Sequence, residues 1–66
     1  MVITAEDLKK FITVENINEQ IKNQWNSPHI ITKHIIGESI WTALDEWDQI
    51  ILEAKTHKLI MENELL

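Results

Sequence analysis

The sequence has 66 residues, of which 44% are hydrophobic, and it contains neither cysteine nor arginine. A single domain of this size (1–66) buries only about 60% of the surface of its unfolded chain, and without disulfides or thiolate metal sites it depends on oligomerisation or a partner for further stability. The net charge of −5 disfavours phosphate backbones, and the absence of a long apolar run or a signal-peptide pattern predicts a cytoplasmic protein with no membrane segment.

Two similar helix starts occupy the first third of the chain. The segments 3–8 and 12–17 each place a threonine, Thr4 or Thr13, before an acidic first turn that contains Glu6 or Glu15. A threonine hydroxyl accepts a free backbone N–H at the N-cap, and a first-turn carboxylate favours the helix dipole. The pattern predicts helices over 5–11 and 14–26.

The next boundary is Ser27-Pro28, because serine caps helices and proline suits the first helical position. This predicts a helix over 28–36, closed by the single glycine, Gly37. Isoleucine and threonine are frequent in this segment and favour strands, so a short strand over 29–36 is the alternative.

A long C-terminal helix over 38–62 is the clearest pattern in the sequence. Its apolar residues follow an alternating four–three spacing that is typical of a heptad seam, interrupted by Lys58. We expect this face to be buried in the domain core, and we expect the same of Trp25 on the second helix. Where the face remains free, it would serve as the oligomer seam. The seam consists of Ile40, Leu44, Trp47, Ile51, Ala54 and Met61, and Leu65 would extend it.

A second apolar line runs along the same predicted helix, about 100° away from the first. It consists of Trp41, Leu52 and Leu59, with Asp45 and Asp48 among them. One buried stripe suffices for a helix in a small bundle, so a second stripe is a candidate surface for a neighbour. These five residues are the predicted partner-binding site.

Catalytic and metal-binding patterns are poorly represented, so we do not expect an enzyme, a cofactor or a metal site. Ser27 and Ser39 are explained as helix-entry residues, and the acids of 45–48 are typical of a solvated helix face. His29 and His34 are five residues apart and therefore do not share one helix face. A glycine-rich phosphate loop cannot form with one glycine.

Two alternatives remain for specific binding. The size and helix count allow a helix-turn-helix regulator that uses the polar helix 14–26, although a basic surface for nucleic acid is missing. The run Gly37-Glu38-Ser39-Ile40 is similar to the Gly-x-Asp-Ser-Leu motif of acyl carrier proteins, a resemblance that implies a prosthetic arm on Ser39. Glu38 stands in the place of the aspartate and one residue after the glycine is missing, so we do not assign the chain to that family.

The sequence thus predicts an all-α bundle of three to four helices that acts as a protein–protein interaction module. The more specific hypothesis is a small acidic inhibitor, antitoxin-like or adaptor protein, of a kind that phages encode, which occludes or sequesters a partner with a basic surface. A homodimer formed through the heptad seam, with a purely structural role, is the other hypothesis.

Overall fold

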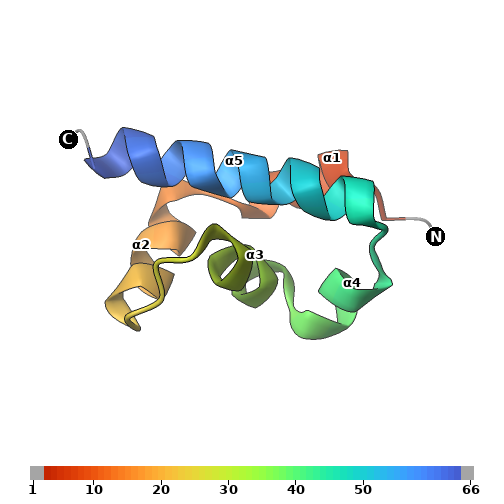
Figure 1. The fold of residues 1–66 in the computed structure, drawn as a ribbon, viewed down its shortest axis with the longest axis horizontal. Helices are drawn as coiled ribbons and strands as arrows, with labels where there is room; N and C mark the ends of the chain where they lie inside the picture. Colours follow the sequence, from red (N-terminus) through yellow and green to blue (C-terminus); the bar gives the residue numbers. More distant parts are fainter. Residues whose placement is uncertain (1–2, 65–66) are drawn as a thin grey trace.

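The computed structural model describes residues 3–64 and shows an all-α protein, as predicted. No strand occurs within 3–64, so the helical interpretation of 29–36 is confirmed. The elements, which Figure 1 labels, are α1 (Ala5–Leu8), the 3-10 turn η1 (Lys9–Phe11), α2 (Val14–Lys22), α3 (Pro28–Ile36), α4 (Glu38–Ala43) and α5 (Glu46–Glu64).

Both threonine caps form as predicted. The Thr4 hydroxyl accepts the backbone N–H of Asp7 at 3.3 Å, and the Thr13 hydroxyl accepts that of Asn16 at 3.1 Å. α2 is shorter than the predicted 14–26, because the chain turns after Asn23 and Gln24 adopts a positive φ of 69°. A residue in the left-handed region cannot continue a right-handed helix.

Gly37 separates α3 from α4, as the sequence predicts. Its φ of 101° lies in the region that side chains with a Cβ rarely adopt, so glycine is required at this turn. Gly37 donates its N–H to the Lys33 carbonyl and accepts the N–H of Trp41, both at 2.9 Å. The same residue therefore ends one helix and starts the next.

The prediction of one continuous helix over 38–62 is wrong. The chain is extended at Leu44, with φ −77° and ψ 149°, and it resumes as α5 at Glu46. The Asp45 carboxylate accepts the Asp48 backbone N–H at 2.8 Å, and the Gln49 side-chain amide donates to the Trp41 carbonyl at 2.9 Å. The break is thus capped on both sides, which meets the requirement that the free N–H and C=O groups at helix ends find partners.

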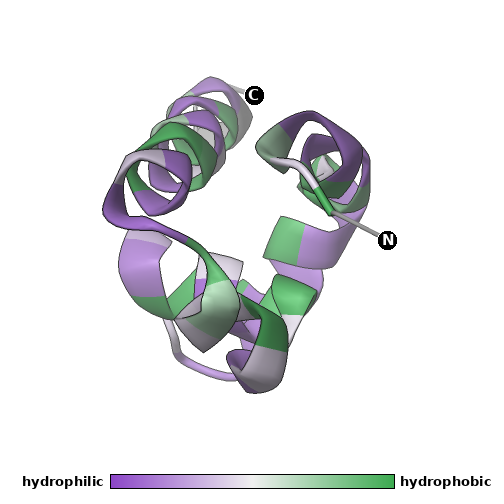
Figure 2. Ribbon diagram, turned by 90° about the vertical axis from the view of Figure 1, so that its right-hand side faces the viewer, coloured by the Kyte–Doolittle hydropathy of each residue, from purple (hydrophilic) through white to green (hydrophobic). Residues whose placement is uncertain are grey.

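α5 forms one side of the molecule and packs against α1, α2 and α3 (Figure 1). Figure 2 shows α5 nearly end-on, with the other helices arranged around the same interior. Every helix except the 3-10 turn contributes to this core, so it is a single one. The buried apolar residues are Ala5, Leu8, Ile12, Ile17, Ile31, Ile36, Trp41, Leu52 and Ile60.

Candidate interaction surface

The inner face of α5 is formed by Leu52, Thr56 and Ile60, which recur every four residues and are buried. Thr56 donates its hydroxyl to the Leu52 carbonyl at 3.0 Å and is also hydrogen-bonded to Thr32 of α3. A hydroxyl has one proton, so Thr32 must be the donor in the bond between the two threonines. This polar pair fixes how α3 and α5 lie against each other.

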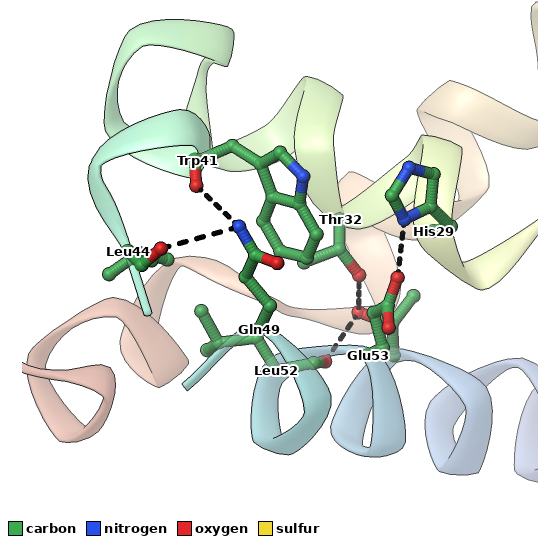
Figure 3. A network of polar contacts seen from close by, with 8 residues as sticks. His29, Thr32, Trp41, Leu44, Gln49, Leu52 and Glu53 are labelled. Atoms are coloured by element: carbon green, nitrogen blue, oxygen red, sulfur yellow. Dashed lines mark hydrogen bonds and ion pairs between the residues drawn. The ribbon is translucent and has the colours of Figure 1, made fainter. Parts of the chain in front are cut away.

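Trp41 extends from α4 into the space between α3 and α5 (Figure 3). It is 5% exposed, and its ring meets that of His29 edge to face, with centroids 5.4 Å apart. The His29 Nδ1 in turn lies 2.5 Å from a Glu53 carboxylate oxygen on α5 (Figure 3). Trp41 is therefore a core residue that joins three helices.

This arrangement corrects the predicted partner-binding site. Trp41 and Leu52 are buried, and Leu59 is half-buried against the core, so the second apolar line is not an exposed stripe. Asp45 is exposed and caps α5, while Asp48 is half-buried beside it. The prediction failed because the break at residues 44–45 changes the phase of Trp41 relative to α5, and because α5 is apolar on more than one face.

The outer face of α5, defined here as Trp47, Ile50, Ala54, Lys58 and Met61, points away from the core. Trp47 is 68% exposed, Ile50 48% and Met61 50%, and Ala54 and Lys58 are exposed as well. At about 100° per residue, these positions lie opposite Leu52, Thr56 and Ile60. The expectation that Trp47 belongs to the core is therefore wrong.

The predicted oligomer seam is divided by the fold. Ile40 and Leu44, which belong to α4 and the break, are partly buried against the core, and so is Ile51. Trp47, Ala54 and Met61 remain exposed along α5. Leu65 lies outside the described residues. The free part of the seam is thus on α5 alone.

A shallow groove of ≈ 530 Å³ runs along the side of α5 that faces η1, and it borders the outer face at Ala54 and Lys58. Ile51 and Ala54 contribute apolar surface, and the Lys55 ammonium group donates to the Lys9 carbonyl at 2.7 Å on the η1 side. The groove therefore combines an apolar seam with a basic wall. Its lining residues are Lys9, Ile51, Ala54, Lys55, Lys58, Leu59 and Glu62.

A second hollow, of ≈ 360 Å³, lies along α3 and the start of α4. It contains His29, His34 and Glu38, with Ile30 and Lys33, and Trp25 stacks on His34 at a centroid distance of 3.7 Å. Within the part of the chain that the structure describes, no three His, Asp or Glu side chains converge as metal ligands. Among the same residues, no helix has the length and apolarity needed to cross a membrane.

Comparison of the chain with models of protein families, with curated proteins and with solved structures found no match in any of the three.

Sequence reasoning missed the break that decides which face of α5 is free, yet a signal for it is present. Asp45 stands three residues before Asp48 at a point without glycine or proline, and an acid pair at this spacing resembles a capping box. We interpreted these acids as a solvated helix face. The structure shows instead that Asp45 starts α5, which places Trp41 inside the domain and Trp47 outside it.

Proposed function

We propose that this chain is a protein–protein interaction module and that the outer face of α5 is its contact surface. The observation that supports this is the position of Trp47, a large aromatic side chain 68% exposed on the longest helix of the described residues. Tryptophan is enriched among the residues that dominate binding energy, and a buried core is already present without it. Exposure of this side chain in a small acidic domain is best explained by a partner that covers it.

The neighbours of Trp47 support the same proposal. Seven large apolar side chains are exposed among the described residues, and three of them, Trp47, Ile50 and Met61, share this face of α5. The other four lie apart from this face: Ile3 precedes α1, and Phe11, Ile21 and Ile30 are on η1, α2 and α3. Single exposed apolar residues are normal on protein surfaces, whereas a row of them along one helix marks an interaction site. The mode is a helix packed against α5, with Trp47 as the anchor.

As a small acidic inhibitor or adaptor, the chain would occlude its partner through this face of α5, and not through the surface around Trp41 that the sequence predicted. Acidic residues at the start of α5, Glu46 and Asp48, flank Trp47. They would increase the rate of encounter with a basic surface, while Trp47 supplies the buried area.

A photo-crosslinking residue at position 47 tests the proposal in the native host. We expect covalent protein adducts at position 47 and none at position 30. Ile30 is the matched control because it is also exposed, by 40%, but lies on α3 and not on the outer face of α5. Each captured protein is then purified and titrated with the native chain and with the Trp47→Glu variant. Equal adducts at both positions, or binding that Trp47→Glu leaves unchanged, would remove the basis of the proposal.

A further inference from the structure

The outer face of α5 carries charges that match a particular partner. In the four–three spacing, the seam positions on α5 are Trp47, Ile51, Ala54, Lys58 and Met61. Asp48 and Lys55 both directly follow a seam position, Trp47 and Ala54 respectively, so they flank the seam on the same side. One flank thus carries an acid near the start of the helix and a base near its middle. When a second copy of the helix runs in the opposite direction, the base of each copy lies beside the acid of the other.

We infer that the partner on this face is the α5 of a second copy of the chain, packed antiparallel and related by a two-fold axis. In this pairing Trp47 lies against Lys58 of the other copy and Ile51 against its Ala54, and each contact occurs twice by symmetry. Met61 extends the same seam towards the end of α5, whereas Leu44 precedes α5 and packs against the core. The inference rests on the proposed function, since it names a second copy of the chain, in place of a basic foreign protein, as the partner of the surface proposed there.

Lys58 explains why the helices run antiparallel. It is exposed in the middle of an otherwise apolar seam, and in a parallel pair it would face Lys58 of the other copy. Two ammonium groups in one seam layer repel each other. In the antiparallel pair each Lys58 covers the indole of Trp47, where the ring face attracts a cation. The exposed tryptophan and the lysine are both unusual in a helix seam, and in this pairing each contacts the other.

The flanking charges select one register among the antiparallel alternatives. The proposed register places Asp48 beside Lys55 of the other copy, twice per dimer. A shift by one heptad in one direction places Asp48 beside Asp48, and a shift in the other direction places Asp48 beside Glu62 and Lys55 beside Lys55. Charges of the same sign facing each other across helices oppose pairing, so only the first register is complementary.

The groove between α5 and η1 provides the space for this contact. Its lining includes the seam residues Ile51, Ala54 and Lys58 together with the flanking Lys55. Lys55 donates to the Lys9 carbonyl and retains two further N–H donors, so it can hold Asp48 of a second copy without losing its contact to η1.

Sedimentation equilibrium of the purified chain, with paired charge variants, tests the inference. We expect the native chain to show a reversible monomer–dimer equilibrium. Asp48→Lys and Lys55→Glu should each weaken dimerisation roughly tenfold, because each variant converts two attractive contacts into two repulsive ones. A one-to-one mixture of the two variants should recover the native affinity as a heterodimer, since the lysine introduced at position 48 then faces the glutamate introduced at position 55, and the unchanged Asp48 faces the unchanged Lys55. Lys22→Glu on α2 is the matched control and should dimerise like the native chain.

Two further measurements keep the test independent of folding. Lys58→Glu alters only an exposed side chain and should weaken the dimer at least about tenfold by placing a carboxylate against Trp47. A mixture of Ile51→Cys and Ala54→Cys chains, made from a protein without cysteines, should oxidise to the mixed disulfide in preference to either symmetric one. A native chain that stays monomeric at millimolar concentration would overturn the inference, as would variants that fail to recover on mixing. If crosslinking at position 47 captured a different protein and the chain were monomeric, the inference would fail while the proposed function stood.

Discussion

Trp41 and Trp47 lie six residues apart and have opposite environments. Trp41 ends up 5% exposed between three helices, whereas Trp47 is 68% exposed on the outer face of α5. Both neighbourhoods are apolar, so hydrophobicity alone does not distinguish them. The difference arises at the break between α4 and α5, which directs one side chain inward and the other outward. One tryptophan thus contributes to the stability of the fold, and the other is available for binding.

The largest effect on stability should come from the replacement of Trp41 by alanine, and Trp47→Ala is the comparison. Trp41→Ala should lower the free energy of unfolding by about 3–5 kcal/mol, because it opens a cavity where α3, α4 and α5 meet. Trp47→Ala should change it by less than about 0.5 kcal/mol when the chain is kept dilute enough to be monomeric. Urea unfolding followed by far-UV circular dichroism measures both values.

Fluorescence quenching supplies the matched control for this pair. Acrylamide should reach a larger fraction of the emission in Trp41→Phe than in the native chain, because the variant lacks the buried indole and keeps exposed Trp47 and half-buried Trp25. Trp47→Phe should remove most of the readily quenched emission. If Trp41→Ala and Trp47→Ala destabilised the protein equally, the assignment of the two faces of α5 would be wrong.

The features that sequence reasoning predicted correctly are those with local physical causes. The caps at Thr4 and Thr13, the proline start of α3 and the turn at Gly37 depend on residues close in sequence, and all are found at the expected positions. The orientation of α5 depends on a distant partner, since Thr32 of α3 meets Thr56. A buried threonine pair is polar, so a search for apolar stripes assigned Thr56 to no face. The predicted site therefore included Trp41 and Leu52, which the fold buries.

The Thr32–Thr56 pair predicts an asymmetric loss of stability on the inner face. Thr56→Val should cost about 1–3 kcal/mol, because the buried Thr32 hydroxyl then loses its acceptor. Thr32→Val should cost less, since Thr56 still donates to the Leu52 carbonyl. The double variant should be close to the native chain, because apolar groups of similar shape then replace both partners. Urea unfolding of the three variants measures this order, and equal costs for the two single changes would contradict the assigned donor.

The smallest effect tests the break itself. Asp45→Ala removes the side chain that accepts the Asp48 N–H at 2.8 Å, and loss of such a cap typically costs about 1 kcal/mol. Asp45→Asn keeps an acceptor at the same place and removes only the charge, so it should retain most of the stability. The difference between the two variants, measured by thermal unfolding at high salt, isolates the cap from the helix dipole. The Gln49 amide still caps the end of α4 in both variants, so the break should persist. If Asp45→Ala were more stable than the native chain, the continuous helix of the sequence prediction would be the preferred state, and Trp41 and Trp47 would no longer be held on opposite sides of the core boundary.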